Sequence, residues 1–296
     1  MNESRVLVVG ATGQLGRVIT RKLIAAGGRV RALARTAATL KPFESQAEIA
    51  AVDLRDLPRL TDACRGVDQI VATANNNLGS GANSPLRADL SAYQNLCAAA
   101  RNTGVRRLIF VSSRGIAQDS LVDIFRIKWY IEDAIRRSGV PCVVLKPAAF
   151  METWIDEILA KGIRDKGVAT IFGDGNNVTN YIAIDDVAEF VVRILSRPDV
   201  VNEAVEIGGP SNVSQNHLAT LVERRLKAPG KRRHVPVIAM RMLPPIVRPF
   251  NEVAARLITL GLYSATEARP FPAWQIPADR FGIAPQTVET YVERMA

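Results

Sequence analysis

The first 150 residues alternate between two hydrophobic periods, and this alternation limits the fold more than any other feature of the sequence. Short β-branched runs are typical of buried strands, and longer stretches with apolar residues three and four apart are typical of helices. We predict strands at residues 6–9, 30–34, 49–52, 69–73, 108–112 and 142–145, with helices such as 15–26 and 86–103 between them. Strand and helix in alternation need right-handed crossovers, so the fold class is α/β, with a doubly wound parallel (Rossmann) sheet.

The pattern loosens beyond residue 150. We predict helices at 151–165 and 185–196, a glycine-rich turn at 173–175, a strand at 204–207, a helix from about Ser214, proline-rich connections, and a last helix over 285–293. These shorter elements predict two domains. Residues 1–150 form the Rossmann domain, and residues 151–296 form a smaller, mixed C-terminal substrate lobe that packs partly back onto the sheet.

A glycine-rich turn joins the first predicted strand to the first helix. Gly10 permits a sharp turn, Gly13 lets the backbone approach a pyrophosphate, and Gly16 lets the helix pack closely on its strand. The N–H groups and the positive end of the helix dipole then face the phosphates. The predicted contacts are Gly10, Thr12, Gly13, Gln14, Leu15 and Gly16. A turn without a ligand is the alternative, but the strand before it and the helix after it favour a dinucleotide.

The next two strand ends indicate which dinucleotide is bound. Arg35 stands where an acidic residue would accept the ribose 2′-hydroxyl of NAD, and its guanidinium suits a 2′-phosphate instead. We therefore expect NADP(H) to be preferred, with NAD(H) as the alternative cofactor; a solvated Arg35 is the competing interpretation. Asp53, followed by Leu54, ends the third strand, where its carboxylate contacts the adenine or caps the next helix.

Composition excludes several classes of protein. A disordered chain would have fewer hydrophobic residues than the 48% found here. The cysteines, Cys64, Cys97 and Cys142, have no partners at metal or redox spacing, which predicts free thiols in a reducing compartment. No signal peptide opens the chain, and no apolar run approaches the ~20 residues of a membrane helix. We expect a cytoplasmic protein with no membrane partner.

Positive charge is concentrated in residues 221–250, which hold eight basic residues and one acid within a chain of net charge +9. Such a run is typical of a nucleic-acid patch or of a solvated surface. Because no aromatic residues alternate with the basic ones to stack on bases, we expect a solvated surface and no nucleic acid.

Several of these motifs together resemble the atypical short-chain dehydrogenase/reductases, and within them the NmrA-like NAD(P)-binding proteins. The resemblance rests on the glycine turn, Arg35, Asp53-Leu54, Ser138-Gly139-Val140-Pro141, Lys146-Pro147-Ala148-Ala149-Phe150, and the stretch Tyr181 to Ala188. It covers about the first 210 residues. It implies that the nicotinamide side is lined by Thr73, Ala74 and Asn75, by Ser112 and Ser113, and by the segment from Pro147 to Phe150.

One departure from the family concerns the chemistry. Many reductases of the wider superfamily use a Tyr-x-x-x-Lys pair, in which the lysine binds the nicotinamide ribose and the tyrosine donates a proton. Lys128 fits the lysine position, but Ile124 replaces the tyrosine. Lys128 falls on the apolar stripe of its helix and there needs a partner, which the ribose hydroxyls would supply. The alternative is an ion pair with Glu132, four residues on.

The other candidate side chains are less specific. Ser112 either binds a substrate carbonyl or caps a turn, and with Lys128 it completes the predicted catalytic set. Tyr130 points away from the Lys128 face, and Tyr181 is a further phenol near the site. His217 and His234 lack second ligands at metal spacing, so no metal is expected.

Three functions fit these features. The first is NADP(H)-dependent reduction of a small apolar carbonyl or quinone by direct hydride transfer. The second is a non-catalytic NADP(H) sensor that acts on a protein partner. The third is a sugar-nucleotide epimerase or dehydratase. A quinone spreads the arriving charge and needs no strong acid, so the missing tyrosine favours the first.

Overall fold

The computed structural model describes residues 4–77 and 79–295, which fall into two compact units. The first unit holds the chain up to Gln118, together with Ile124–Lys146 and Val187–Val205. The second holds Asp119–Asp123, Pro147–Asp186 and the chain from Glu206 onward. The predicted division at residue 150 makes two consecutive blocks, whereas these contacts return Val187–Val205 to the first unit.

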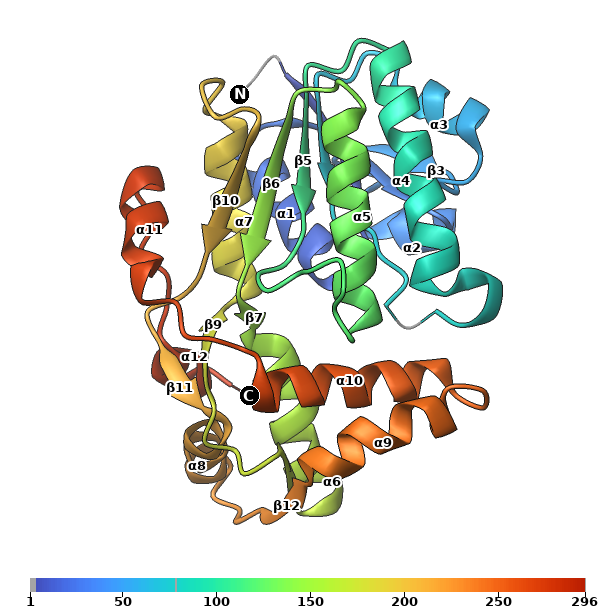
Figure 1. The fold of residues 1–296 in the computed structure, drawn as a ribbon. Coiled ribbons are helices and arrows are strands. Elements are labelled where there is room, and N and C mark those ends of the chain that lie inside the picture. Colours follow the sequence, from blue (N-terminus) through green and yellow to red (C-terminus); the bar gives the residue numbers. More distant parts are fainter. Residues whose placement is uncertain (1–3, 78, 296) are drawn as a thin grey trace. The chain divides into compact units, whose positions relative to one another are not determined.

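A seven-stranded sheet organises the first unit, in the order β10-β6-β5-β4-β1-β2-β3 (Figure 1). Its strands are β1 (Arg5–Val9), β2 (Arg29–Ala34), β3 (Glu48–Ala51), β4 (Gln69–Ala72), β5 (Arg107–Val111), β6 (Cys142–Pro147) and β10 (Glu203–Ile207). The pairs along β3-β2-β1-β4-β5-β6 are all parallel. The doubly wound α/β prediction is confirmed, with its six N-terminal strands within two residues of their predicted places.

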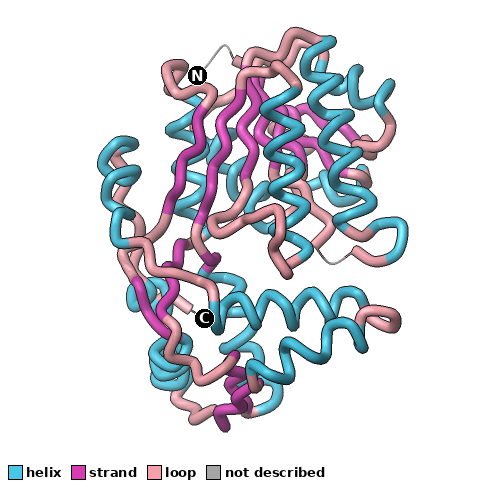
Figure 2. The backbone as a smooth tube through the Cα atoms, in the orientation of Figure 1, coloured by secondary structure: helices cyan, strands magenta, loops and turns pink. Residues whose placement is uncertain are grey.

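Helices lie on both sides of this sheet, as Figure 2 shows in cyan against magenta strands. They are α1 (Gln14–Ala25), α2 (Ala37–Leu40), α3 (Leu57–Cys64), α4 (Pro85–Asn102), α5 (Asp123–Arg137) and α7 (Ile184–Leu195). One core joins the apolar faces of α3, α4 and α5 to strands β1, β4, β5 and β6. Parallel strands need this double cover, which explains their continuous apolar runs.

Smaller sheets form the second unit: β11-β9-β7 and β12-β8. The strands are β7 (Ala149–Phe150), β8 (Val168–Phe172), β9 (Val178–Ile182), β11 (Asn212–Ser214) and β12 (Lys231–Val235). The helices are a π-helix (Glu152–Ala160), α6 (Lys161–Lys166), α8 (Gln215–Leu226), α9 (Val237–Val247), α10 (Glu252–Thr266), α11 (Gln275–Phe281) and α12 (Val288–Glu293). A separate apolar core joins the π-helix, α8 and α12 to strands β8 and β9.

The segment from β12 to α10 differs from its prediction. We expected proline-rich connections there, but the chain forms β12, α9 and α10, and Pro244 and Pro245 lie inside α9. Proline disfavours helix interiors because it lacks an N–H and crowds the preceding turn. Here Met240 and Pro244 are buried, so tertiary packing outweighs the local preference.

Candidate functional site

Strands β1 and β4 are neighbours in the sheet, although β2 and β3 separate them in the sequence. The chain therefore leaves the centre of the sheet in opposite directions on the two sides of this pair. In open α/β sheets, ligands bind outside the carboxyl ends of the strands at such a reversal. Val9, the last residue of β1, pairs with Ala72, the last residue of β4. The glycine turn and Thr73 thus begin side by side, where a ligand site is expected.

The glycine turn is fixed by backbone contacts that leave no room for side chains. Gly10 has φ +85°, and its N–H donates to the Leu33 carbonyl at 3.0 Å. A Cβ on Gly10 would lie 2.8 Å from the Ala74 nitrogen, and a Cβ on Gly16 only 2.1 Å from the Gly10 oxygen. The turns after β1 and β4 are therefore in direct contact, and only glycine fits at these two positions.

Gly13 differs from the other two glycines, because a Cβ there would meet only the Gly10 oxygen, at 3.4 Å. Gly13 is the N-cap of α1, where no side chain caps the helix and no acidic residue occupies the first turn. Gly13 and Gln14 are exposed and Thr12 is half-buried, whereas the Leu15 side chain is buried. Leu15 would contact a ligand only through its backbone. The open space over an uncapped helix N-terminus fits a pyrophosphate.

Two arginines lie near the ends of β2 and β3. Arg35 follows β2 and is exposed. The Asp53 carboxylate accepts bonds from the Arg55 backbone N–H at 2.9 Å and from its Nη2 at 2.7 Å. The Arg55 guanidinium, with a smaller effect of the Arg35 charge, lowers the pKa of Asp53. Sequence reasoning missed Arg55, although an arginine two residues after an acid is a common sign of such a pair.

The N-cap alternative for Asp53 is wrong. Helix α3 is capped by Asp56, whose carboxylate accepts from the Arg59 N–H at 3.2 Å. Leu54 is buried, so its side chain belongs to the core of the first unit. Asp53 with its arginine partner therefore stays available at the sheet edge for the predicted adenine contact, which remains a prediction.

Lys128, on α5, is held at the carboxyl end of β5. Its Nζ donates to the Ser112 carbonyl at 2.7 Å and to the Val111 carbonyl at 3.3 Å. Burial lowers the pKa of Lys128 to about 8, although the negative charges of Glu132 and Asp89 act in the opposite direction. Backbone oxygens at a strand end orient this ammonium. An amine with a pKa near neutrality serves as a proton donor or as a hydroxyl ligand.

Glu132 is not the ion-pair partner of Lys128 that the alternative interpretation required. Its buried carboxylate contacts Lys146 at 3.1 Å and Arg136 at 2.5 Å. It also accepts the Ser112 hydroxyl at 2.5 Å. This network is a feature that sequence reasoning missed, since it joins residues from β5, α5 and β6. Its effect is to fix the strand end whose carbonyls hold Lys128.

Ser112 itself is buried, and its hydroxyl already donates to Glu132. The predicted contact with a substrate carbonyl does not fit this arrangement, because the hydroxyl faces a carboxylate inside the protein. Neither is it a simple turn cap. Ser113 is half-buried and thus the more accessible of the two hydroxyls. The geometry gives Ser112 a positioning role, through its carbonyl toward Lys128 and its hydroxyl toward Glu132.

A small pocket brings Lys128 together with the loop that follows β4. It is lined by Thr73, Ala74, Asn75, Asn77, Asp89, Tyr93, Phe110, Val111, Ile124, Ile127, Lys128 and Ile131. Tyr93, which sequence reasoning did not select, donates to the Ala74 carbonyl at 2.7 Å, and burial raises its pKa well above the usual value. Asp89 accepts from the Asn76 backbone and side chain at 3.1 and 2.6 Å. Helix α4 therefore anchors the loop, and Tyr93 is a poor replacement for the missing acid.

The remaining candidates lie in the second unit. Pro147 ends β6, and Phe150 ends β7, which pairs with β9. Their predicted nicotinamide contacts remain predictions. Tyr181 is fully buried in the core of this unit, which raises its pKa. A fully buried phenol does not reach a substrate.

The histidines have partners of their own. His217 lies 3.6 Å from Glu289, and His234 Nδ1 is 2.9 Å from the Gly173 carbonyl oxygen. Among residues 4–77 and 79–295, no three potential ligands gather in a group that would hold a metal ion.

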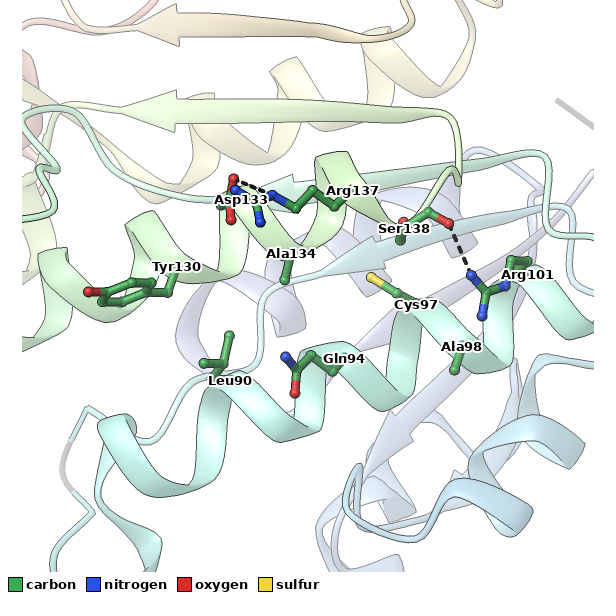
Figure 3. A pocket seen from close by; sticks show the side chains of 10 residues that line it. All are labelled: Leu90, Gln94, Cys97, Ala98, Arg101, Tyr130, Asp133, Ala134, Arg137 and Ser138. Carbon is green, nitrogen blue, oxygen red and sulfur yellow. Dashed lines mark hydrogen bonds and ion pairs between the residues drawn. The ribbon is translucent and has the colours of Figure 1, made fainter.

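A larger hollow of about 390 Å³ lies between α4 and α5, on the outer side of the first unit (Figure 3). Tyr130 lines it, which agrees with the expectation that this phenol does not share the face of Lys128. Among the residues that line the hollow, Arg137 is paired to Asp133 at 3.1 Å and Arg101 donates to the Ser138 carbonyl at 3.5 Å. The hollow shares no residue with the Lys128 pocket.

Within the described ranges, no helix combines the length and the apolar character that crossing a membrane requires.

Comparison with known proteins tests the predicted family and fold. The model of a family described as NAD(P)H-binding matches residues 10–198. An NAD(P)H azoreductase of Xenophilus azovorans is 30% identical over 217 residues, 72% of this chain and 71% of that protein. A (4-alkanoyl-5-oxo-2,5-dihydrofuran-3-yl)methyl phosphate reductase of Streptomyces griseus is 29% identical over 91% of this chain and 96% of its own.

Among solved structures, that of an NADPH-dependent quinone oxidoreductase from Escherichia coli, in complex with NADPH, aligns with a TM-score of 0.78 at 18% identity. The alignment covers 97% of this chain and 98% of that one, and it shows the shared fold. The resemblance noted in the sequence is thereby confirmed. The chain belongs to the family described as NAD(P)H-binding.

Proposed function

We propose that the protein is an NADP(H)-dependent reductase of a small quinone or similarly conjugated apolar acceptor. The observation that carries this proposal is the Lys128 ammonium, held by two backbone carbonyls beside the loop after β4, with Ile124 in place of a tyrosine. The site thus has a cation for the ribose, and the Tyr93 phenol that lines the pocket is already engaged by the Ala74 carbonyl. The quinone oxidoreductase of the same fold and the azoreductase relative agree with this substrate class.

The chain's own residues divide the binding of the cofactor among three places. The N–H groups at the start of α1 would hold the pyrophosphate, and Arg35 would pair with the 2′-phosphate. Lys128 would donate to the nicotinamide ribose hydroxyls. When bound, the reduced nicotinamide supplies a hydride to the acceptor. Thr73 and Ala74 would line the nicotinamide end of the site, where the Thr73 hydroxyl donates to the Val9 carbonyl and Ala74 lies close to Gly10.

The proton donors in the pocket determine which class of acceptor the site suits. An isolated carbonyl develops a localised alkoxide as the hydride arrives, and a placed acid is needed to stabilise it. Tyr93 does not meet this need, since it is buried and donates to a backbone oxygen. A quinone spreads the charge over its ring and takes its proton afterwards. With a pKa of about 8, Lys128 supplies that proton near neutral pH and regains it from water.

The test is NADPH oxidation by the full chain with a panel of quinones, an azo dye and simple aldehydes. We expect turnover with quinones at least 100-fold faster, in kcat/KM, than with aldehydes. A Lys128→Met variant should lose most of the quinone activity, whereas Lys22→Met, on the far end of α1, should keep it. Equal rates with aldehydes would contradict the proposal.

Tight NADPH binding without turnover of any acceptor is the outcome that supports the sensor function instead. In that case, NADPH should raise the melting temperature of the protein and Arg35→Ala should reduce the rise, with no acceptor consumed.

A further inference from the structure

Exposed apolar side chains gather on one part of the second unit. Among the described residues, ten large hydrophobic side chains are exposed, and six of these fall between residues 238 and 257. They are Ile238, Met242, Leu243, Ile246, Phe250 and Leu257. Phe250, at 89% exposure, lies between α9 and α10. Isolated exposed hydrophobic residues are common, but a contiguous group of this kind marks an interaction surface.

Three of these residues form a stripe along helix α9. Ile238, Met242 and Ile246 are spaced by four, so they lie on one face, whereas Met240 and Pro244 are buried on the opposite face. Arg241 is the only charged residue of α9. A helix that is apolar all round is normally buried in a core or in lipid. At 11 residues, α9 is far too short to span a membrane of about 30 Å of hydrocarbon.

Basic side chains lie on α9 and on the strand before it, and the acid Glu252 follows Phe250 at the start of α10. Arg241 is exposed within α9, and Lys231 and Arg233 are exposed on β12, immediately before it. Arg248 precedes Phe250 and is paired with Asp123 at 3.0 Å. Residues 221–250 contain one acid, Glu223, which is itself paired with Arg232. The electrostatic surroundings of the stripe therefore favour an anionic partner.

We propose that α9 and the turn carrying Phe250 dock on the surface of an anionic lipid bilayer. A short helix with an apolar face and arginine at its border lies in the plane of the interface, with its apolar side chains in the acyl boundary and its cations among the headgroups. From the sequence we expected no membrane partner. The exposed stripe appears only in the fold and is the reason for proposing a peripheral membrane contact.

A second copy of the chain is a less suitable occupant. In a two-fold symmetric contact, the stripe of one copy would meet the stripe of the other, because such contacts use the same patch on both subunits. Both patches would carry the positive charges of Arg233 and Arg241, and like charges oppose such a contact. An anionic bilayer matches both the apolar face and the charge.

The experiment is co-sedimentation of the full chain with vesicles, either phosphatidylcholine alone or an equal mixture of phosphatidylcholine and phosphatidylglycerol. We expect binding to the mixed vesicles, weakened by salt, and little binding to phosphatidylcholine. The double variant Ile238→Ser/Phe250→Ser should lower the partition coefficient at least tenfold, because two large apolar groups no longer leave water. Arg241→Gln should lower it about fivefold.

Ile276→Ser is the matched control, since Ile276 is 71% exposed, as is Ile238, but lies on α11. It should bind vesicles as the wild type does, and all variants should keep the wild-type melting temperature. No binding of the wild type to mixed vesicles overturns the proposal, and so does an equal loss in Ile276→Ser. A dimer in solution that only the double variant dissociates, without vesicle binding, would assign the stripe to a second copy instead.

Discussion

The glycine turn and the Lys128 corner both lie at carboxyl ends of strands in one sheet, yet they are built differently. The turn is held mainly by backbone contacts of Gly10 with Leu33 and Ala74, and the side chains of Thr73 and Arg17 add hydrogen bonds to its carbonyls. The corner is made of side chains from several elements, with Lys128 on β5 carbonyls and Glu132 joining Ser112 to Lys146.

This difference shows how each region tolerates change. Backbone contacts leave no alternative positions, so a single added carbon in the turn displaces the strand ends themselves. A side-chain network has several members. Loss of one member changes the charge and orientation of the others but leaves the fold in place. The glycine turn should therefore respond to substitution in stability, and the Lys128 corner in catalysis and pH dependence.

The largest effect is expected for Gly16→Ala, whose Cβ would lie 2.1 Å from the Gly10 oxygen. Overpacking of this kind costs about 1–3 kcal/mol, which lowers the melting temperature by roughly 2–12 °C for a protein of this size. Differential scanning fluorimetry measures the melting temperature.

Gly13→Ala is the control within the same turn, because a Cβ on Gly13 has space and the φ of Gly13 is −69°. It should melt within about 2 °C of the wild type and still bind NADPH at least tenfold more weakly. Equal melting temperatures of the Gly16→Ala and Gly13→Ala variants would contradict the prediction that only Gly16 lacks room for a Cβ.

The second largest effect is expected for Lys128→Met. Hydrogen bonds to a charged group contribute about 1.5–3 kcal/mol, so kcat/KM for NADPH should fall roughly 10- to 150-fold. The melting temperature should stay level or rise, because burial opposes the charge of Lys128 in the folded state. Steady-state kinetics and a melting curve on one preparation give both values. A large fall in melting temperature would make Lys128 a structural residue.

Arg35→Ala tests the phosphate end. Losing a charge-assisted contact should weaken NADPH about tenfold and leave the dissociation constant of NADH unchanged. Calorimetric titration with the two nucleotides measures both constants. Arg137→Ala is a suitable control, since Arg137 faces the outer hollow between α4 and α5 (Figure 3). If the variant bound NADH equally more weakly, Arg35 would not select the 2′-phosphate.

The smallest effect concerns pH. Lys128 loses its charge as the pH rises through about 8, so kcat/KM should fall above that value. The contribution of Lys128 to stability runs the other way. Its folded pKa lies below the ordinary value of 10.5, so the folded state releases the proton first, and stability rises between about 8 and 10.5.

Glu132→Gln sharpens this test. The Glu132 charge raises the pKa of Lys128, so its removal should move the midpoint of the activity profile to lower pH. Ser112 retains an acceptor in this variant. A midpoint that stays in place would show that Glu132 acts only through packing.

The parts of the site that sequence could predict are those that depend on local geometry. Gly10, Gly13 and Gly16 are recognisable because strand, turn and helix follow one another within a few residues. Lys128 was found because it fits the lysine position of the Tyr-x-x-x-Lys pair in the family that the sequence resembles, and its spacing places it on the apolar stripe of one helix. Glu132, Tyr93 and Asp89 were not assigned their positions, because their partners lie 13 to 20 residues away on other elements. Such contacts depend on how helices pack on the sheet, which spacing along the chain does not encode.

Prediction of the fold from the sequence has the same limit. Strands of the parallel sheet are buried on both faces and carry continuous apolar runs, so six of them were predicted. Helix α9 was missed because Pro244 and Pro245 argue locally against a helix, and only packing at Met240 and Pro244 stabilises it. The apolar residues of its outer face then looked like part of a loop.

The three cysteines offer a further use of the first unit. Cys64, Cys97 and Cys142 are free and buried, and burial raises the pKa of each thiol, that of Cys64 to about 12. Thiolates, which react with alkylating reagents, are thus scarce in the folded protein. They lie on α3, α4 and β6, so modification reports the opening of separate layers around the sheet. The rate at which each cysteine is alkylated, measured by mass spectrometry, therefore reports local opening of the first unit. No cysteine has to be introduced for this measurement.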